Sequence, residues 1–546
     1  MTSSRNSRVV GLRSRVATTA LLSISVISAH AQTANPATLQ SQEQRIQRFY
    51  EDRRETAPTP VADPVQDTAP AAASTDGGAS IRFVLREVRF AGSAFLDPSS
   101  LQATAQPYLG LEVGIAELDA MLAAVNQAYA DKGITTARAV LGTQAVRNGV
   151  VQVDLVEGRL GELAVQGNAH TDAAFVRDRV RQRQGEVVDT AALRRDLVYF
   201  NRTTDLQAQA LLRPGTERGR TDILVQLTEP ARRYADVFVD NAGVDSTGRE
   251  RIGIQARLNG LVGGSDRLAA SFAYAEGGLE GQASYSWLVS RRNARLGVSY
   301  SRSQINIING AFRDLDIEGD SSVIGLDFAQ PFVATQRWMF SGLASLSRSS
   351  SQTAVAGERI ADTRSTVYSV GAHLSHQGEG REWSLTQLAS SISADAPVVG
   401  RDRFTIAPGN LSYLQRFGQS RWGLRANAGW QYSGDDALTS SSLFQIGGLG
   451  SVRGYERGVL SGPRGYFVDL ELHRAFGQRW DTYAFVDHGA IKGEFPRSAD
   501  ITGVGLGGSW RRDWLAVSLD LGHALDRVLA DQNDTRVDFR VTARWQ

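Results

Sequence analysis

The chain has 546 residues, a formal net charge of +1 and no cysteine. The lack of cysteine excludes disulfides and thiolate metal sites, and the near-neutral charge argues against a nucleic-acid partner, which requires a concentrated basic surface. No apolar run reaches the length of a transmembrane helix. The seven histidines show no metal-ligand spacing, so neither a metal nor a cofactor is expected.

Residues 1–31 have the pattern of a secretory signal peptide. Four arginines precede a short apolar stretch from Val16 to Ile27, and Ala29-His30-Ala31 is a small-x-small cleavage pattern. We therefore expect the mature chain to begin at Gln32 and to leave the cytoplasm.

A mostly polar helix within residues 32–55 is predicted to follow, and a linker over residues 56–80 comes after it. The thin apolar stripe of the helix consists of Leu39, Ile46, Phe49 and Tyr50. The linker is rich in Pro, Ala, Thr and Gly and lacks hydrophobic periodicity. This composition predicts a disordered tether.

Two copies of a strand-helix-helix-strand-strand pattern occupy residues 81–160 and 161–231. In the first copy, the second helix is predicted from Ala116 to Lys132. Its apolar residues share one face, which is the spacing of a helix that packs on a sheet. Each copy has the size of a small α+β domain, so the pair forms an internal repeat.

From residue 232 to residue 546 the helical periodicity disappears, and apolar and polar residues alternate. Period two is compatible with a soluble sandwich or with a membrane barrel that is apolar outside and polar inside. Sixteen strand-like runs, several of them ten or more residues long, favour a closed transmembrane barrel without unpaired edges. The connections at 306–321 and 351–364 are predicted to be long, and the connection at 378–380 very short, as in barrels with long outer and short periplasmic loops.

Two glycine-rich stretches lie in the barrel region. The first, from Gln445 to Tyr466, contains Val452-Arg453-Gly454-Tyr455 and by itself indicates only a loop with an exposed arginine. The second, from Gly503 to Gly508, matches G-x-G-x-x-G but lacks the βαβ context of a dinucleotide site. We expect it to be a barrel strand. No Ser, His and acid set can be nominated, and no enzyme is indicated.

The order of these segments and several local motifs resemble the transporters of two-partner (type V) secretion, the TpsB group (ShlB/FhaC/HecB) of the BamA-like superfamily. The two repeats correspond to POTRA domains: "VRFAGSAFLD" opens the first, "DLVEGRLGELAVQGNAH" joins them and "LLRPGTERGRTDILVQLTE" closes the second. Phe485-Val486-Asp487-His488-Gly489 is similar to the family's Phe-x-Asp-x-Gly strand motif. The chain departs from the usual aromatic C-terminus of such barrels, because Gln546 follows Trp545.

The resemblance implies that the first glycine-rich loop folds back into the barrel and that Arg453 meets Asp487. Alternation supports this placement, since a lipid face at Thr482, Ala484 and Val486 leaves Asp487 in the lumen. The predicted loop-barrel lock consists of Val452, Arg453, Gly454, Tyr455, Phe485, Asp487 and Gly489. The resemblance also implies that the N-terminal helix plugs the barrel. A mobile periplasmic helix is the alternative.

The implied function is secretion of a large β-rich exoprotein, an adhesin, haemolysin or contact toxin, across the Gram-negative outer membrane without ATP. The N-terminal domains would lie in the periplasm, and the POTRA-like domains would recognise the exoprotein by adding it to a sheet edge. The other implied partners are outer-membrane lipid and the barrel assembly machinery, and we expect a monomer. An outer-membrane β-barrel assembly factor or insertase is the alternative function.

Overall fold

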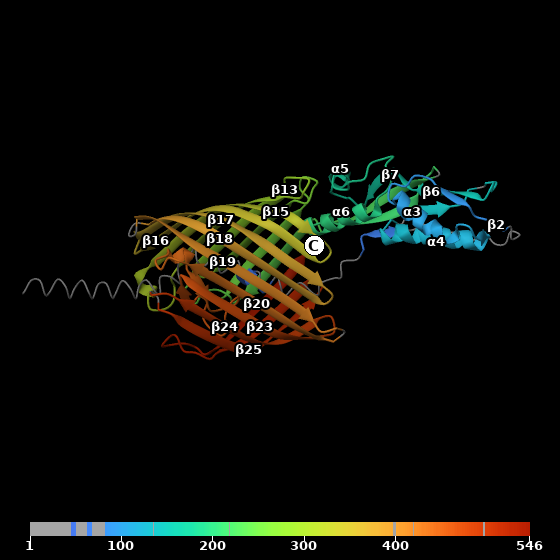
Figure 1. Cartoon of the computed structure of the whole chain (residues 1–546). Coiled ribbons are helices and arrows are strands. Elements are labelled where there is room, and N and C mark those ends of the chain that lie inside the picture. Colours follow the sequence, from blue (N-terminus) through green and yellow to red (C-terminus); the bar gives the residue numbers. More distant parts are fainter. Residues whose placement is uncertain are drawn as a thin grey trace, which may run out of the picture.

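The computed structural model describes residues 45–47, 49–50, 63–67 and 82–545, except 135, 143, 218, 397–399, 419 and 495–496. The predicted signal peptide, the C-terminal Gln546 and most of the predicted helix and linker lie outside these residues. The described chain forms a barrel with an elongated arm at one end, and its C-terminus lies at the end that carries the arm (Figure 1). Within the described residues no helix is long and apolar enough to cross a membrane.

The outer half of the arm is the first α+β repeat. Its core sheet has the order β3-β6-β5, with β3 parallel and β5 antiparallel to β6. Helix α4 begins after Gly114, whose N–H donates to Glu117 Oε2 (2.7 Å), and buries Met121, Val125 and Tyr129 against the sheet. The elements of this repeat are β2 (Phe83–Val84), β3 (Glu87–Phe90), α3 (Pro98–Ala105), η1 (Gln106–Tyr108), β4 (Glu112–Val113), α4 (Ile115–Asp131), β5 (Ala137–Val140) and β6 (Val150–Glu157).

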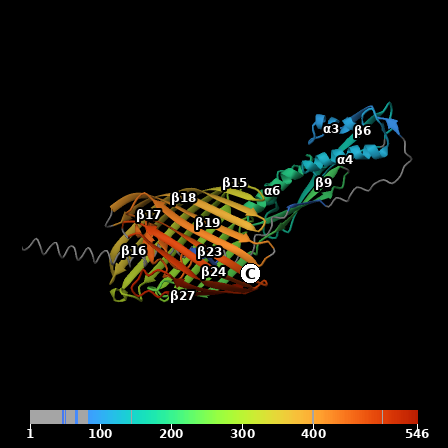
Figure 2. The same cartoon turned by 60° about the horizontal axis from the view of Figure 1, so that its bottom comes forward.

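The second repeat has the same order of elements and lies between the first repeat and the barrel (Figure 2). Asp189 caps α6 by accepting the N–H of Ala192 (2.7 Å), and α6 buries Leu193, Leu197 and Phe200 in the core. Its elements are β7 (Arg159–Gln166), α5 (Ala173–Arg177), α6 (Thr190–Thr203), β8 (Gln207–Pro214) and β9 (Arg220–Thr228).

Part of the predicted linker is ordered. Strand β1 (Val65–Asp67) pairs in parallel with β8, and the Ala210 N–H donates to the carbonyl of Pro64 (2.7 Å). The side chain of Val65 is buried in the core of the second repeat, and Asp63 pairs with Arg194 (2.9 Å). The prediction of disorder is therefore wrong for residues 63–67. Composition cannot reveal that the free edge of β8 supplies main-chain partners.

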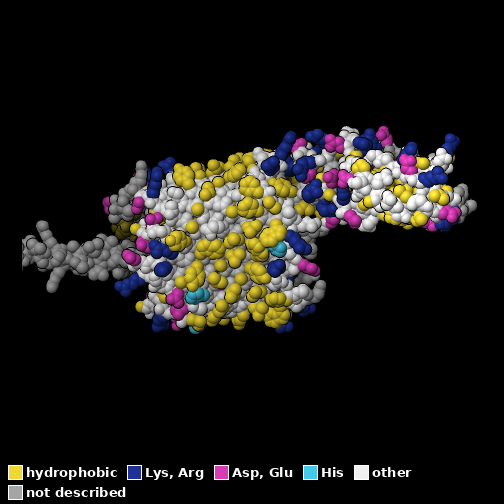
Figure 3. Space-filling model, in the orientation of Figure 1, with side chains coloured by type: hydrophobic (Ala, Val, Ile, Leu, Met, Phe, Trp, Pro, Cys, Tyr) yellow, Lys and Arg dark blue, Asp and Glu magenta, His cyan; other side chains and the backbone are white. Residues whose placement is uncertain are grey.

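Sixteen antiparallel strands close into a barrel, in sequence order, with β27 paired to β10. The predicted fold class is confirmed. Hydrophobic side chains gather on the outer wall of the barrel, and charged ones lie toward its ends (Figure 3). The strands are β10 (Arg233–Asp240), β11 (Arg251–Asn259), β12 (Arg267–Ala275), β13 (Gly278–Leu288), β14 (Arg295–Asn306), β15 (Ile317–Ala334), β16 (Trp338–Val355), β17 (Glu358–Gly378), β18 (Arg381–Ala396), β19 (Gly400–Arg416), β20 (Trp422–Ser433), β23 (Arg464–Phe476), β24 (Trp480–Lys492), β25 (Ala499–Arg512), β26 (Leu515–Ala524) and β27 (Thr535–Trp545).

The predicted long connection at 351–364 is wrong. Strands β16 and β17 continue to a two-residue turn at Ala356 and Gly357, both with positive φ (49° and 78°). The 306–321 connection is also shorter than predicted, because β15 begins at Ile317. Main-chain pairing persists where the hydrophobic alternation has ended, so the pattern alone placed these strand ends too early. The very short connection between β17 and β18 is observed.

The second repeat contacts the turns at one end of the barrel. Arg179 Nε donates to Asn293 Oδ1 (2.6 Å), and the Tyr199 hydroxyl lies 3.0 Å from the Pro331 carbonyl. Asp205 accepts from Arg267 of β12 and from Arg295 of β14 (2.6 and 3.2 Å). These contacts fix the arm at the end where the turns after β13, β15 and β17 lie.

Candidate functional site in the barrel lumen

The glycine-rich loop folds back into the barrel. It connects β20 to β23 and contains η3 (Ser440–Ser442) and the short antiparallel strands β21 (Phe444–Ile446) and β22 (Leu460–Gly462). Its apolar side chains form a buried cluster with residues of the barrel wall. The buried members are Ile446, Val452, Tyr455, Phe467, Ile491, Ile501 and Ala524. The cluster explains why so polar a loop stays inside the barrel.

Glycines allow the loop to approach the wall at backbone distance. Gly454 has a φ of 93°, and a Cβ on it would lie 2.9 Å from the amide nitrogen of Ala524. A Cβ on Gly503, in β25, would lie 2.0 Å from the Arg453 carbonyl oxygen, which is an impossible contact. A Cβ on Gly489 would meet Val452 at 3.0 Å. The G-x-G-x-x-G match is thus part of a strand, as expected, and its first glycine is a packing site for the loop.

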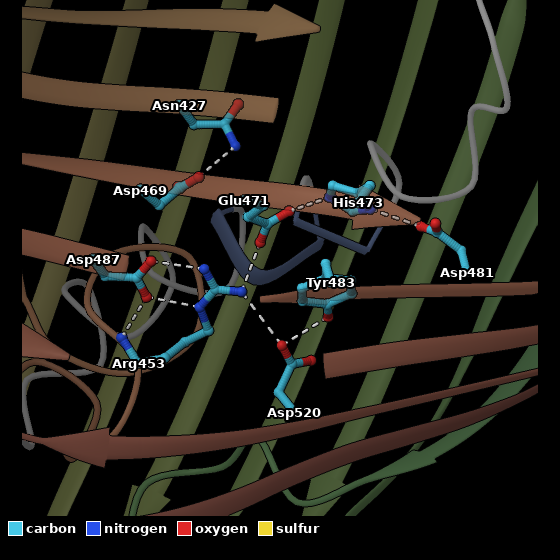
Figure 4. Close-up of polar contacts among 9 residues, drawn as sticks. All are labelled: Asn427, Arg453, Asp469, Glu471, His473, Asp481, Tyr483, Asp487 and Asp520. Carbon is cyan, nitrogen blue, oxygen red and sulfur yellow. Dashed lines mark hydrogen bonds and ion pairs between the residues drawn. The ribbon is translucent and has the colours of Figure 1, made fainter. Parts of the chain in front are cut away.

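Arg453 and Asp487 form a bidentate ion pair (Figure 4). Arg453 Nε donates to Oδ2 and Nη2 to Oδ1, both at 2.7 Å, and the backbone N–H of Arg453 also reaches Oδ2 (3.0 Å). The exposed fractions are 1% and 0%. The carboxylate therefore orients both the guanidinium and the loop backbone.

Two further carboxylates contact the same guanidinium. Arg453 Nη1 lies 2.6 Å from Glu471 Oε1, on β23, and 3.3 Å from Asp520 Oδ1, on β26. Sequence reasoning did not nominate either residue. Both belong to the polar faces of strands that alternate with apolar residues, and this alternation is the signal that could have identified them.

Hydrogen bonds extend this group across the wall (Figure 4). Tyr483 donates to Asp520 (2.7 Å). His473 Nε2 lies 2.8 Å from Glu471, and its Nδ1 lies 2.7 Å from Asp481. The ion pair thus connects strands β23, β24 and β26 to the loop.

Aromatic residues complete the predicted lock. The Arg453 guanidinium carbon lies 3.6 Å from the centroid of the Phe485 ring, the geometry of a cation–π contact. The Tyr455 hydroxyl donates to the Thr502 carbonyl (2.7 Å) and accepts the N–H of Asp526 (2.9 Å). All seven residues of the predicted lock therefore lie in or against one loop-wall interface.

The described helical residues 45–47 and 49–50 lie inside the barrel. Ile46, Phe49 and Tyr50 form a buried cluster with Ala242 and with Leu449 of the loop. The Tyr50 ring lies 3.8 Å from the guanidinium carbon of Arg540. Arg45 Nη1 donates to the Gln445 carbonyl of the loop (2.9 Å).

A second buried ionic cluster lies beneath Tyr50. Asp240, on β10, accepts from Arg251 Nε and Arg540 Nε at 2.8 Å each. Arg251 and Arg540 come from β11 and β27, so the cluster lies where the last strand of the barrel meets the first. The helix therefore contacts the loop and the closing strands together.

A cavity of about 1540 Å³ remains beside the helix and the loop. Arg45 and Phe49 line one side of it. Hydroxyl side chains are prominent on the opposite wall, namely Ser347, Ser349, Ser365, Ser369, Ser384, Ser390 and Ser412. In the part of the chain that the structure describes, no cluster of His, Asp and Glu has the arrangement of a metal site.

An outer-membrane transport barrel with periplasmic POTRA domains is the class that this architecture defines. The family described as "Haemolysin secretion/activation protein ShlB/FhaC/HecB" matches residues 219–510, and "POTRA domain, ShlB-type" matches residues 83–158. The chain belongs to the ShlB/FhaC/HecB family, and its partner is accordingly a secreted exoprotein.

Individual relatives agree with this assignment. The outer membrane transporter CdiB of Dickeya dadantii is 25% identical over 492 residues, 83% of this chain and 85% of the relative. The heme/hemopexin transporter protein HuxB of Haemophilus influenzae is 23% identical over 382 residues, 67% of each chain. The solved structure of CdiB from Escherichia coli has the same fold, with a TM-score of 0.66 at 20% identity, covering 95% of this chain and 99% of that one.

Proposed function

We propose that this protein moves one large, unfolded, β-rich exoprotein from the periplasm through the barrel lumen to the cell surface, without ATP. The observation that carries the proposal is the hydroxyl-lined cavity beside the loop and helix. Serine hydroxyls both donate and accept hydrogen bonds, so they can serve a passing backbone without holding it through charge. Folding of the exoprotein outside would give the transport its direction.

The N-terminal helix is the plug in this proposal. Phe49 and Arg45 line the cavity, so withdrawal of the helix would enlarge it. The Arg453 loop has the complementary role of a fixed part of the wall, held by three carboxylates. We further propose that the protein is monomeric, since its closed barrel leaves no free strand edge. We also propose that the barrel assembly machinery inserts it.

Capture of the exoprotein by strand addition would fall on β5 of the first repeat. The equivalent strand of the second repeat, β8, already carries β1 of this chain as an added parallel strand. Among the described strands, β5 pairs only with β6. The pairing of β1 with β8 supports the view that this edge of the repeat accepts an extended segment.

A site-specific photo-crosslinker tests this capture. At Arg138, an exposed residue of β5, the crosslinker should trap the exoprotein during secretion. At Arg89, an exposed residue of β3 on the opposite edge of the same sheet, it should not. Equal crosslinking at both positions would argue against strand addition at β5.

Removal of both repeats tests the function as a whole. Deleting residues 81–230 should abolish secretion while the barrel still inserts, and undiminished secretion would refute the proposal. Depletion of the protein separates transport from the alternative, a β-barrel assembly factor. Loss of one surface protein supports transport, whereas broad loss of outer-membrane proteins supports assembly.

A further inference from the structure

A band of aromatic side chains surrounds part of the barrel at the end that carries the arm. Trp422 (β20), Phe476 (β23) and Trp480 (β24) are exposed on the outer wall, and the Trp480 ring lies 6.3 Å from that of Trp510 (β25). The arm is periplasmic, so this band lies at the level of the lipid headgroups of the periplasmic leaflet. Tryptophan is enriched at that level because its ring is apolar and its N–H is polar.

One arginine lies within this band and faces lipid. On β23 the exposed residues Leu470 and Leu472 point outward, and Arg474 follows on the same face. Its guanidinium carbon lies 5.2 Å from the centroid of the Trp422 ring and 5.0 Å from that of Phe476. Arg474 is exposed, and among the described residues no carboxylate forms an ion pair with it. Two strand residues advance about 7 Å, so the charge lies one such step beyond the apolar surface.

The surroundings of Arg474 are basic. Arg421 and Arg479 are exposed in the adjacent turns, and the Arg421 carbonyl accepts the N–H of Ala475 (2.9 Å). The nearest acids in the sequence, Glu471, Asp469 and Asp481, lie on the lumen side. Glu471 binds Arg453 and His473, Asp469 binds Asn427, and Asp481 binds His473. A counter-charge stabilises a cation at the edge of the hydrocarbon region, and the described part of the protein forms no ion pair with Arg474.

We propose that Arg474, with Trp422 and Phe476, binds the phosphate of an anionic glycerophospholipid in the periplasmic leaflet. The guanidinium presents parallel N–H groups that match two phosphate oxygens. The two rings restrict the guanidinium by cation–π contact and offer an apolar surface to the start of the acyl chains. Arg421 and Arg479 add the positive field that favours an anionic headgroup. This site does not depend on the transport function.

Native mass spectrometry of the purified protein, titrated with phosphatidylglycerol or phosphatidylcholine, tests the proposal. The wild type should bind the first phosphatidylglycerol several-fold more tightly than phosphatidylcholine, and Arg474→Gln should remove that preference. Trp422→Leu keeps the charge and should weaken binding only partly. Arg348→Gln is the matched control, because Arg348 is an exposed arginine on the outer wall of β16, ten residues from the start of that strand.

Three outcomes would overturn the proposal. They are equal binding of both lipids by the wild type, an unchanged preference in Arg474→Gln, and equal loss in Arg474→Gln and Arg348→Gln, which would indicate general attraction to charge. A heat-modifiability gel on each variant verifies that the barrel is folded before lipid is added.

Discussion

Arg453 and Asp487 are 34 residues apart in sequence and meet through two parallel contacts of 2.7 Å in the interior of the barrel. One residue belongs to a glycine-rich loop and the other to the wall. Since Glu471 and Asp520 approach the same guanidinium, the two partners are not equivalent. The loop contributes one cation to a wall that contributes three anions.

Because Arg453 contacts three carboxylates, we expect Arg453→Ala and Asp487→Ala to impair secretion to different degrees. Arg453→Ala removes the cation that three buried carboxylates share and should almost abolish secretion, whereas Asp487→Ala leaves Arg453 with two carboxylates and should impair secretion less. The cost of an uncompensated buried charge is about 3–5 kcal/mol. The double mutant should be little worse than Arg453→Ala, because both changes remove one interaction. Secretion assays on inserted barrels measure all three.

Arg302→Ala is the matched control for this series. Arg302 pairs with Asp320 at 2.8 Å, but both side chains are exposed, and such surface pairs contribute about 0–1 kcal/mol. Its secretion should be near that of the wild type. Fully additive defects of Arg453→Ala and Asp487→Ala would show that the two residues act separately.

Two glycines of β25 should differ sharply in their tolerance of substitution by alanine. Gly503→Ala places a methyl group 2.0 Å from the Arg453 carbonyl, whereas Gly508→Ala meets its nearest neighbour at 3.5 Å. We expect Gly503→Ala to displace the loop and reduce secretion, and Gly508→Ala to be tolerated. Limited proteolysis of the purified barrel should detect the displaced loop. Equal protease resistance in both variants would contradict the observed packing.

The aromatic contact of the helix should control the resting conductance of the barrel. Tyr50→Ala removes the ring that lies on Arg540, so the helix should leave the lumen more often. Tyr50→Phe retains the ring and serves as the control. Planar-bilayer recordings should show higher mean conductance for Tyr50→Ala, and higher still after deletion of Leu39 to Arg54, while secretion largely persists. Equal conductance with and without the helix would show that the helix does not occupy the pore of the membrane-inserted barrel.

His473 should stabilise the carboxylate group that surrounds Arg453. Both of its ring nitrogens lie within 2.8 Å of a carboxylate oxygen, and only the doubly protonated ring can donate to both. His473→Phe keeps a planar ring but leaves Glu471 and Asp481 without this cation. The unfolding temperature in detergent should fall, by less than for Arg453→Ala.

An exposed histidine provides the comparison for His473→Phe. His523 lies on the outer wall, where its Nδ1 lies 3.0 Å from the Thr535 hydroxyl. His523→Phe should leave the unfolding temperature nearly unchanged. Equal shifts in the two variants would mean that the carboxylate contacts of His473 contribute little.

The barrel strands could be predicted because each alternates apolar and polar residues, and alternation is a local property. The start of β17 near the outer turn, from Glu358 to Arg364, could not, because this charged segment is held by main-chain pairing with β16. Periodicity carries no information about such pairing. The same limit hid β1, whose partner β8 lies more than 140 residues further along the chain.

The lock shows which part of a site a motif can indicate. Arg453 and Asp487 belong to sequence motifs, so their meeting could be expected from the resemblance. Glu471 and Asp520 belong to no motif. They are two of many polar residues on lumen faces, and only the strand order, which places β23, β24 and β26 around the loop, brings them to the guanidinium.

The pairing of β1 with β8 limits how far the N-terminal helix can move away from the barrel. The predicted linker has 25 residues, but residues 63–67 are held on the second repeat, which leaves 12 residues of sequence between Tyr50 and Asp63. Fully stretched, the path from Tyr50 to Asp63 reaches at most about 45 Å. Because this connection is short, the helix stays near the mouth of the barrel while β1 is paired with β8. Detachment of β1 would therefore set how far the plug can retreat.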